Sequence, residues 1–567
     1  MGGDRDPVKL IRQPRGPRGG NPPHVRRIAG PTAAIAWVLA AALPLAFVGV
    51  FFAWPVASIV GRGLFPDGAL DIAGIVEVLS RPRTVRILGF TVGIAAAATA
   101  ITLVLGMPIA YVLSRLRFRG RAVLRAAVLV PFVLPTVVVG IAFRALFRDT
   151  PIDGSVLAIL AALVFFNIAV VARTVAVTWE SLDPRREEAA RVLGAGPVRV
   201  FATITLRRLA PSIAASASIV FLFCSTAFGT VLVLGGARYA TIETEIWLLT
   251  TQFLDLSAAS VLSVAQLVVV LVLLAVTARV RAGTTAQQRS FAARRPRASD
   301  TPVIVVAVVV ALALVVPLVA LVERSLRVAG EWGFDNYVAL ASTGSRNALS
   351  VTPWQALGNS LGFAAAATGV AMLVGLVACL LLSRRPRSPH ARRALDLLDG
   401  ALMLPLGVSA VTVGFGFLIT LNAPPLDLRS SPVLVPIAQA LVAVPLVVRT
   451  LLPVLRSVGG RMRDAAATLG AAPWRVMVTI DLGVAGRATL AATGLAFTVA
   501  LGEFGATTFL SRPDAATLPV VIYRLIGLPG GDNAGMATAA SVVLAVTCVA
   551  VVALVERLRV DTAGRLT

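Results

Sequence analysis

The sequence predicts an all-α polytopic membrane protein of about twelve transmembrane helices, arranged as two tandem six-helix units. Three observations carry this prediction. Of the 567 residues, 57% are hydrophobic and only 14% are charged, whereas soluble domains are about one quarter charged. Uncharged runs close to membrane-spanning length recur along the whole chain. Finally, one segment of the first half returns in the second half.

The expected spans follow from the thickness of a bilayer, which needs about 20 apolar residues of helix. In the first half, the uncharged runs occupy residues 31–61, 87–114, 126–143, 155–172, 209–237 and 256–278. In the second half, they occupy residues 302–322, 347–383, 400–426, 430–448, 488–511 (interrupted by Glu503) and 533–555. Because the 347–383 run is too long for one span, we expect its first third to be an outer loop or a re-entrant segment.

These runs divide the chain into two transmembrane units with polar segments around them. The expected parts are a basic tail (1–30), a first unit (31–281), a linker (282–301), a second unit (302–556) and a short tail (557–567). The linker is rich in Arg, Ala and Ser, a composition typical of a flexible connection.

The basic residues predict the orientation of the chain. The 52 Lys and Arg residues against 28 Asp and Glu residues give a net charge of +24, which by itself could indicate nucleic-acid binding. The arginines instead cluster between the uncharged runs, for example at 114–125 and 185–208. If twelve spans alternate, all these clusters fall on one side, as the positive-inside rule requires. We therefore expect a cell-membrane protein with both termini in the cytoplasm, embedded in the lipid bilayer and without a nucleic-acid partner.

Several kinds of chemistry are excluded by residue counts. Lys9 is the only lysine, so the chain cannot contain the GxxxxGK[ST] phosphate-binding loop. Its two histidines, His24 and His390, lie in Arg-rich segments. The three cysteines, Cys224, Cys379 and Cys548, lie far apart within apolar runs, which indicates core or lipid-phase positions. We expect no catalytic residue, cofactor or metal site in this chain, and no ATP hydrolysis by the chain itself.

An internal repeat joins the two halves. Residues 188–206 read EAARVLGAGPVRVFATITL and residues 464–482 read DAAATLGAAPWRVMVTIDL, so eleven of nineteen positions match at an offset of 276. The same offset aligns Phe228 and Gly229 with Phe504 and Gly505. A parallel duplication of six spans places a pseudo-two-fold axis along the membrane normal.

The repeated segment has the pattern acidic-Ala-Ala-x-x-x-Gly. Its members are Glu188, Ala189, Ala190 and Gly194 in the first copy and Asp464, Ala465, Ala466 and Gly470 in the second. The alanines favour a helix whose flat surface another protein can approach closely. Each glycine suits a left-handed helix stop. We expect each acidic residue to lie near the helix start, where the helix dipole favours negative charge.

This motif resembles the EAA loop of ABC importer permeases, EAA-x3-G-x9-I-x-L-P. The six-plus-six layout makes most of the chain similar to the fused permeases of the thiamine and ferric-iron importer group. The resemblance implies a type I importer fold, two coupling helices that seat on two copies of an ABC ATPase subunit, and an extracytoplasmic substrate-binding protein. Arg207 and Gly483 replace the closing proline, and Asp464 replaces the usual Glu, so we expect unequal ATPase contacts.

A twelve-span secondary transporter of the major-facilitator type, without an ATPase partner, is the alternative. Such a transporter also arises by duplication of six spans, and the arginines of residues 114–125 are similar to its basic loop. It would need intramembrane ionisable residues for ion coupling, and this sequence has few of them.

The solute pathway is predicted from two segments, 221–247 and 502–525, which look like the corresponding regions of thiamine permeases. The sequence GEFGAT within the second segment is shared with ferric-iron and molybdate permeases. Five residues are candidates for this pathway: Glu243, Glu245, Glu503, Trp247 and Tyr523. The three acids would suit a cationic solute. The two aromatic residues would either stack on a ring or anchor the chain at the membrane interface.

Glu503 differs from the other candidates because the offset of 276 places Ala227 at its position in the first half. A carboxylate within a span is costly unless it meets water, a partner or the interior of the bundle. We expect Glu503 to face the central pathway, with a partner from another span or from the solute. The alternative is that its carboxylate caps or bonds backbone within the bundle.

Overall fold

The computed structural model describes residues 31–66, 68–282, 291–328, 330–384, 388–422, 427–428, 431–458, 460–528 and 530–564. The expected tail at 1–30 lies outside these described residues, as do residues 283–290 of the expected linker and the last three residues of the chain.

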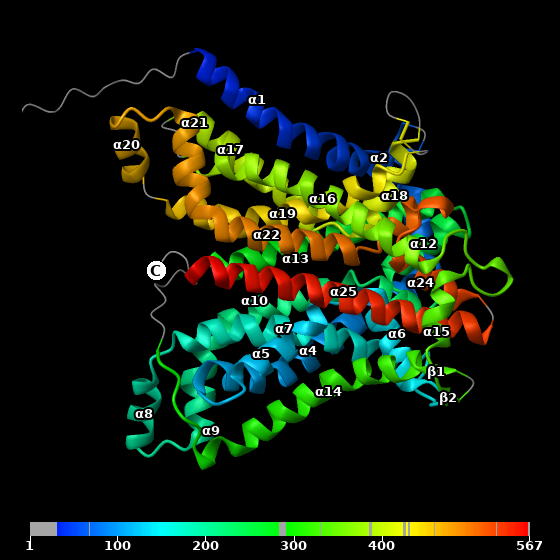
Figure 1. Cartoon of the computed structure of the whole chain (residues 1–567), viewed down its shortest axis with the longest axis horizontal. Helices are drawn as coiled ribbons and strands as arrows, with labels where there is room; N and C mark the ends of the chain where they lie inside the picture. The colour runs from blue at the N-terminus through cyan, green and yellow to red at the C-terminus, as the bar shows by residue number, and fades with distance from the viewer. Residues whose placement is uncertain are drawn as a thin grey trace, which may run out of the picture.

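The chain is helical almost throughout the described part (Figure 1). The first half contains α1 (Pro31–Val48), α2 (Trp54–Leu64), α3 (Ile72–Ser80), α4 (Pro82–Arg115), α5 (Arg121–Val133), α6 (Thr136–Phe147), α7 (Val156–Glu180), α8 (Pro184–Val192), α9 (Pro197–Val200), α10 (Leu206–Ser225), α11 (Gly229–Gly235), α12 (Ile242–Thr251) and α13 (Leu256–Ala282). Three segments are π-helical, namely Gly49–Ala53, Phe201–Thr205 and Met477–Leu482.

The second half follows the same plan with one addition, a short hairpin. It contains α14 (Thr301–Ser325), β1 (Arg327–Val328), β2 (Glu331–Trp332), α15 (Asp335–Val338), α16 (Pro353–Leu382), α17 (Pro389–Met403), α18 (Ala410–Thr420), α19 (Leu434–Ser457), α20 (Gly460–Thr468), α21 (Pro473–Val476), α22 (Gly483–Gly502), α23 (Thr507–Leu510), α24 (Leu518–Gly527) and α25 (Gly531–Gly564). The antiparallel pair β1–β2 joins Arg327 with Trp332 and Val328 with Glu331.

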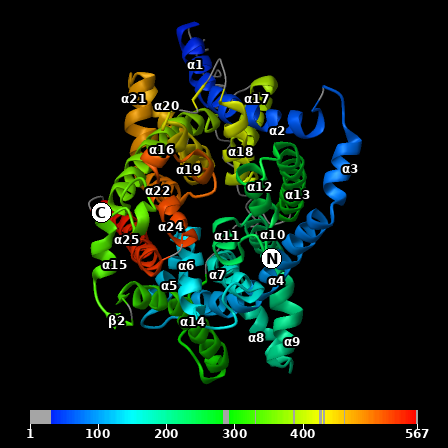
Figure 2. The same cartoon turned by 90° about the vertical axis from the view of Figure 1, so that its right-hand side faces the viewer.

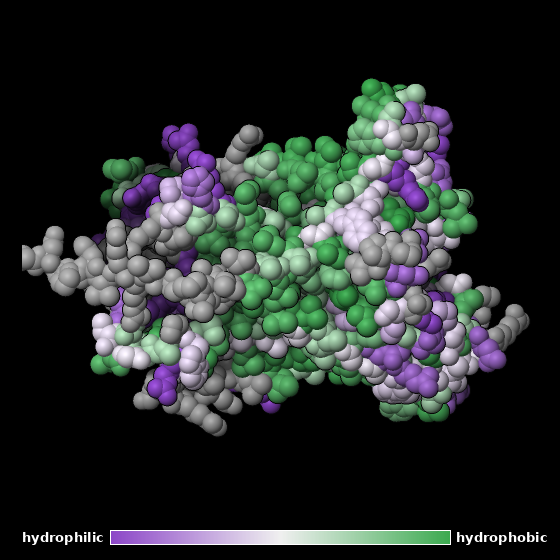
Figure 3. All heavy atoms as spheres, turned by 90° about the horizontal axis from the view of Figure 1, so that it is seen from above, coloured by the Kyte–Doolittle hydropathy of each residue, from purple (hydrophilic) through white to green (hydrophobic). Residues whose placement is uncertain are grey.

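The expected all-α membrane architecture is confirmed. By length and composition, ten helices of the described residues could cross a membrane, and twelve segments could do so if each of two bent pairs is one span. On the face seen in Figure 3, apolar residues form a band across the middle of the molecule, and polar residues gather towards both ends. This distribution is the one that a bilayer about 30 Å thick selects.

Two of the expected spans are broken rather than straight. In place of a helix over 126–143, α5 and α6 meet at 105°. Pro135 causes this break, because the residue before a proline is driven out of helical geometry, and Leu134 is extended at ψ 141°. In place of a helix over 400–426, α17 and its short 3₁₀ extension meet α18 at 99°. There Ser409 begins a new helix by accepting a hydrogen bond from the Thr412 amide.

Three other boundaries differ from the expected ones. The helix expected over 209–237 ends at Ser225 and is followed by the separate short helix α11. The long 347–383 run enters its helix already at Pro353, where Thr352 and Gln355 form a capping box. At the C-terminus, α25 continues to Gly564 through most of the expected tail.

The first helices of the two halves pack across the boundary between the halves. Helix α1 packs against α16 of the second half, and α2 lies between α18 of the second half and α13 of its own (Figure 1). Helix α14 packs against α4 and α6 of the first half and also against α25 of its own. Thus the first span of each half bridges to the other half. The expected boundaries 31–281 and 302–556 divide the sequence but not the packed bundles, because a lipid-facing helix can bury its apolar stripe on either neighbour.

The last part of the linker is docked, contrary to the flexible connection expected from its composition. The Arg117 amide donates to the Arg294 carbonyl oxygen at 2.7 Å, and the Arg294 amide donates to the Arg115 carbonyl oxygen at 3.0 Å. Asp300 is buried, and it accepts hydrogen bonds from the Arg294 guanidinium and the Tyr111 hydroxyl at 2.7 to 2.8 Å. The hydrogen bond to Asp300 raises the pKa of Arg294. Residues 291–300 are therefore tied to the first half.

Candidate functional site

The two copies of the repeated motif lie at one end of the molecule. Helices α8 and α20 stand beyond the ends of the long helices, at the same end as the start of α1 (Figure 1). The side chains of Glu188, Ala189, Asp464 and Ala465 are exposed, whereas Ala190 and Ala466 are half-buried. The alanines therefore present a flat outer face, as the sequence pattern predicts.

Both motif glycines stop their helices in left-handed geometry, which confirms the expected helix stop. Gly194 has φ +84° and Gly470 has φ +82°. The Ala195 amide donates to the Ala190 carbonyl oxygen, and the Gly194 amide donates to that of Arg191, both at 3.0 Å. These two bonds form a Schellman motif. The second copy repeats both bonds at the equivalent residues.

The expected place of the acidic residues is wrong. Helix α8 begins at Pro184 and α20 begins at Gly460, so Glu188 and Asp464 are each the fifth residue of their helix rather than members of the first turn. The start of α8 is instead capped by Asp183, whose carboxylate accepts from the Arg185 amide at 3.0 Å. Because the helix dipole acts within the first turn, it does not account for the motif acids.

Equivalent apolar side chains are exposed beside the two motifs. Leu193 and Leu469 are 87% and 88% exposed, and Val198 and Trp474 are 80% and 64% exposed. Each pair is related by the offset of 276. Large apolar side chains scattered singly on a surface need no explanation, but here the same positions are exposed in both copies. The second copy carries the larger side chain.

Four aromatic residues meet between the two halves. The Phe228 and Phe504 rings are stacked with centroids 5.4 Å apart, and the Trp247 and Tyr523 rings meet edge to face at 5.8 Å. Both pairs are related by the offset of 276. Two residues related by a two-fold axis can touch only beside that axis. These four residues, here called the central aromatic cluster, therefore lie on the pseudo-two-fold axis.

The elements that hold this cluster also lie at the centre of the molecule. Seen from the end opposite α8 and α20, helices α11, α12 and α24 are surrounded by the longer helices (Figure 2). Gly229 and Gly505 allow the close approach. A Cβ atom on Gly229 would lie 2.5 Å from the Thr136 hydroxyl of α6, and one on Gly505 would lie 2.8 Å from the Ala410 side chain of α18. The repeated Phe-Gly pairs thus pack on the second helix of each bent pair.

The structure corrects the interfacial interpretation of Trp247 and Tyr523. Trp247 is 9% exposed, and Tyr523 is half-buried against it, so neither is an anchor at the membrane surface. The Trp247 indole nitrogen is buried without a hydrogen-bond partner among the described residues. Buried indole N–H groups usually have a partner, which leaves this donor available to a ligand.

The two candidate acids of α12 have different environments. Glu243 is fully buried, and the Ser409 hydroxyl at the start of α18 donates to its Oε2 atom at 2.6 Å. Its Oε1 atom has no hydrogen-bond partner that meets the usual distance and angle among the described residues. Besides that of Ser409, the polar side chain beside the carboxyl group is that of Gln266. Glu243 and Trp247 are four residues apart, so they lie on the same face of α12.

Glu245 is occupied by an internal cation rather than open to a solute. The Arg83 guanidinium donates to both carboxylate oxygens, at 2.6 and 2.8 Å. This bidentate arrangement is the strong form of an Arg–carboxylate pair. Of the two acids on α12, Glu243 is thus the one that lacks an internal cation in the described part of the chain.

Glu503 does not lie within a span, and its partners are local. It follows the last residue of α22, and its carboxylate accepts from the Ala506 and Thr507 amides at 2.7 and 3.1 Å. Among the described residues, no side chain of another span bonds to this carboxylate, so the expected partner from another span is not found, whereas a contact with the solute stays a prediction. The alternative, a carboxylate that bonds backbone within the bundle, is the observed arrangement, and it holds the short helix α23.

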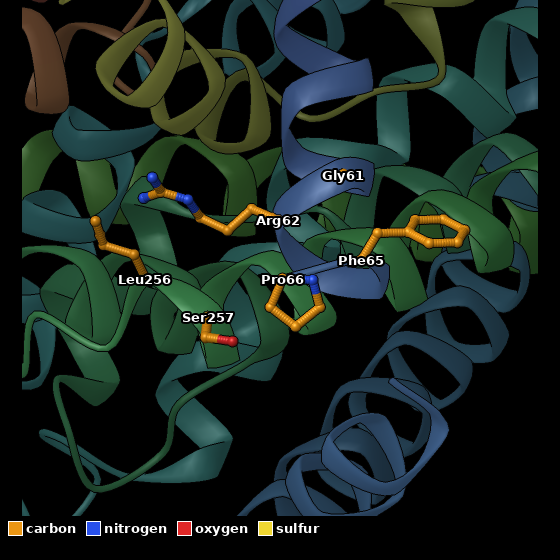
Figure 4. Close-up of a pocket in the computed structure, with 6 residues that line it drawn as sticks. All are labelled: Gly61, Arg62, Phe65, Pro66, Leu256 and Ser257. Carbon is orange, nitrogen blue, oxygen red and sulfur yellow. The ribbon is translucent and has the colours of Figure 1, made fainter. Parts of the chain in front are cut away.

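One cavity lies between the end of α2 and the start of α13. Its volume is about 420 Å³, and it is lined by Gly61, Arg62, Phe65, Pro66, Leu256 and Ser257 (Figure 4). These residues come from the end of α2 and the start of α13. None of them belongs to the central aromatic cluster, so this cavity is not part of the candidate pathway.

Sequence reasoning missed Ser409, Arg83 and Gln266 as neighbours of the two α12 acids. No spacing in the sequence links these residues to α12, because all three contacts depend on packing between distant helices. The pairing of Trp247 with Tyr523 could have been predicted, because the repeat offset of 276 maps one residue onto the other.

Comparison with known proteins places this architecture among transport proteins. Residues 102–289 match the family of the binding-protein-dependent transport system inner membrane component. The matched segment includes the first repeated motif and the first-half members of the central aromatic cluster.

Individual relatives extend the similarity over most of the chain. The thiamine transport system permease protein of Escherichia coli (strain K12) is 29% identical over 411 residues, which cover 70% of this chain and 72% of the relative. The thiamine transport system permease protein of Brucella abortus (strain 2308) is 26% identical over 498 residues, or 83% and 87% of the two chains. The molybdate/tungstate transport system permease protein of Pyrococcus abyssi is 33% identical over 171 residues, or 30% and 66%.

Proposed function

We propose that this chain is the permease of an ABC importer and that it carries thiamine across the membrane, driven by separate ATPase subunits. The premise is its multi-pass helical fold together with its resemblance to the thiamine transporters. The observation that supports this most directly is the similarity to thiamine permeases over 70% to 83% of the chain. The facilitator alternative, which uses no ATPase, does not account for two motif loops with the same exposed apolar positions.

The ATPase contact is assigned to helices α8 and α20. Glu188, Ala189, Ala190 and Gly194 on one side, and Asp464, Ala465, Ala466 and Gly470 on the other, form the two coupling surfaces. Leu193 and Leu469 stand beside them with nearly their whole side chains exposed. Because the pseudo-two-fold repeat presents two such surfaces, two copies of an ABC ATPase subunit bind, one to each half.

The opposite end of the molecule then faces outward and receives a substrate-binding protein. This orientation places α8, α20 and both termini in the cytoplasm, in agreement with the arginine distribution and the positive-inside rule. ATP-driven closure of the ATPase pair would move α8 and α20 together, and the halves would turn about the axis that the central aromatic cluster occupies.

The solute is a cation that carries an aromatic ring. Glu243 supplies a buried carboxyl group, and Trp247, one turn further along α12, supplies an indole ring. Glu243 Oε1 and the Trp247 N–H have no hydrogen-bond partner among the described residues. An aromatic ring attracts a cation placed over its face. Thiamine combines a positive charge with ring systems, whereas ferric iron, the other solute considered from sequence, would use the carboxylate alone.

Reconstitution of the chain with its ATPase subunit and binding protein tests this function. Thiamine uptake into proteoliposomes is expected to require all three components and ATP. Leu193→Arg and Leu469→Arg should abolish ATPase binding, because each places a charge in an apolar contact. Glu323→Gln, at an exposed ion pair of the other end, is the matched control and should transport normally.

The proposal fails if the purified chain hydrolyses ATP by itself or transports thiamine without the ATPase. Uptake of ferric iron or molybdate in place of thiamine would retain the importer assignment and overturn the proposed solute.

A further inference from the structure

Each coupling helix is fastened to the body of the protein by a cluster of three polar side chains. In the first half the cluster consists of Arg115, Glu187 and Thr205. The Arg115 guanidinium donates to Glu187 Oε1 at 3.3 Å, and the Thr205 hydroxyl donates to the same oxygen at 3.0 Å. Arg115 also donates to the Leu182 carbonyl oxygen at 3.0 Å. Glu187, on α8, is thus tied to the end of α4 and to the helix that follows the loop.

In the second half the cluster consists of Arg384, Arg463 and Asp481. The Arg463 guanidinium donates to Asp481 Oδ1 at 2.7 Å, and the Arg384 guanidinium donates to Oδ2 at 2.9 Å. Arg463 also donates to the Leu455 carbonyl oxygen at 3.2 Å. The Asp481 side chain is fully buried. This cluster ties α20 to the end of α16 and to the helix that follows the loop.

The two clusters occupy equivalent positions in the two halves, but the acidic residue stands at a different position in each cluster. The offset of 276 maps Glu187 onto Arg463 and Thr205 onto Asp481, and the offset of 269 maps Arg115 onto Arg384. In the first half the coupling helix supplies the carboxylate. In the second half the coupling helix supplies a guanidinium, and the carboxylate comes from the following segment. The contact between α4 or α16, the coupling helix and the following segment is preserved although two of its three residues have changed type.

A π-helical turn places the third residue of each cluster. The π-helical segments Phe201–Thr205 and Met477–Leu482 are related by the same offset, and they contain Thr205 and Asp481. An inserted π turn redirects the side chains that it carries, and such turns occur often at functional sites. Its presence in both halves shows that the geometry of the contact, rather than one particular ion pair, is retained.

Each cluster includes the residue that directly precedes the repeated motif, so the anchoring contact bears on coupling. Glu187 directly precedes Glu188, and Arg463 directly precedes Asp464. The exposed motif face and the anchored side chain therefore belong to the same short helix. Because α8 and α20 have three helical turns or fewer, a side chain anchored at this point contributes directly to the orientation of the motif face.

We propose that the clusters Arg115–Glu187–Thr205 and Arg384–Asp481–Arg463 are interchangeable anchors that orient the two coupling helices for the ATPase. Glu187 and Asp481 are positioning residues, since they act through α8 and α20. The second anchor is the firmer of the two, because its carboxylate is fully buried and pairs with two guanidinium groups. The role in coupling rests on the proposed function, whereas the anchoring itself does not.

Exchange of the two arrangements tests the proposal. Glu187→Arg alone leaves the first cluster with two guanidinium groups and no acid. The added Thr205→Asp then recreates the arrangement of the second cluster. In the second half, Asp481→Thr removes the acid and the added Arg463→Glu recreates the arrangement of the first half. Each pair of changes forms a double-mutant cycle, which isolates the coupling between the two positions.

Two readouts separate anchoring from transport. The first is the mobility of a nitroxide label on Leu193→Cys or Leu469→Cys in the purified chain without ATPase; the native Cys224, Cys379 and Cys548 are buried and should not compete for the label. The second is ATP-driven uptake by the complete complex. Each single change should raise label mobility in its own half and reduce uptake about tenfold, and the second change should restore both to within about twofold.

The proposal is overturned if the double variants are no better than Glu187→Arg and Asp481→Thr. It is also overturned if the single changes leave mobility and uptake unaltered. If label mobility follows the expected pattern while the wild-type chain neither binds ATPase nor transports, the anchoring is retained and the importer function is the part that fails. Glu323→Gln, remote from both clusters, should change neither readout.

Discussion

Gly194 and Gly470 have a backbone conformation that other residues adopt only with strain. At φ +84° and +82°, a β-branched side chain costs about 2 kcal/mol. A Cβ atom meets no other atom within 4 Å at either site, so strain rather than collision is the expected effect.

We expect Gly194→Val and Gly470→Val to displace the last turn of the coupling helix and to reduce substrate-stimulated ATP hydrolysis, while the chain still inserts. Hydrolysis by the reconstituted complex provides the measurement. Gly194→Asn is the control, because Asn tolerates left-handed geometry. Equal losses for Val and Asn would show that the conformation is not the cause.

At Glu503 the observed contacts lead to a different expectation from that of the sequence. Glu503→Gln retains one acceptor oxygen and loses one of the two charge-assisted bonds to the Ala506 and Thr507 amides, a loss of about 1.5 kcal/mol. We expect a lower thermal midpoint of the purified chain and equal, small effects on the uptake of charged and neutral solutes. Loss of uptake restricted to cationic solutes would return Glu503 to the pathway.

At the scale of an element, the docked linker segment 291–300 depends on one carboxylate. Asp300 accepts from Arg294, from Tyr111 and from the Arg297 amide. Asp300→Asn removes the charge that pairs with Arg294, which is half-exposed, so the loss is about 2 kcal/mol.

We expect Asp300→Asn to release this segment, which limited trypsin digestion after Arg294 or Arg297 would detect as faster cleavage. Asp149→Asn breaks an exposed pair with Arg324 and serves as the control, because exposed pairs contribute little. An unchanged digestion rate for Asp300→Asn would mean that the two backbone bonds suffice.

At the scale of the whole molecule, the proposed orientation places both coupling loops in the cytoplasm. A cysteine introduced at Arg199 or Arg475 should resist a membrane-impermeant thiol reagent in intact cells and react after the cells are opened. The three native cysteines are buried, so they should add little background. Ready labelling in intact cells would reverse the orientation.

The duplicated plan and the local backbone signals could be predicted because they depend on neighbouring residues. Apolar runs, the Phe-Gly pairs and the glycine stops of α8 and α20 are short-range features, and the structure agrees with them. Even the errors over 126–143 and 400–426 have local causes, since Leu134–Pro135 and Ser409 are visible signals for a break. The role of the motif loops remains a prediction.

The sequence by itself determined that this chain is a duplicated, all-α membrane protein, because hydropathy and repetition are properties of the chain. Only the tertiary structure decided which partner each polar side chain has. Glu245 is paired with Arg83, Glu503 bonds nearby backbone, and Glu243 reaches Ser409 of the other half. The sequence also did not predict that α1 packs on the second half and α14 on the first half. The physical reason is that an apolar helix surface is compatible with many neighbours, whereas a hydrogen bond requires two groups within about 3 Å, and only packing brings distant residues that close.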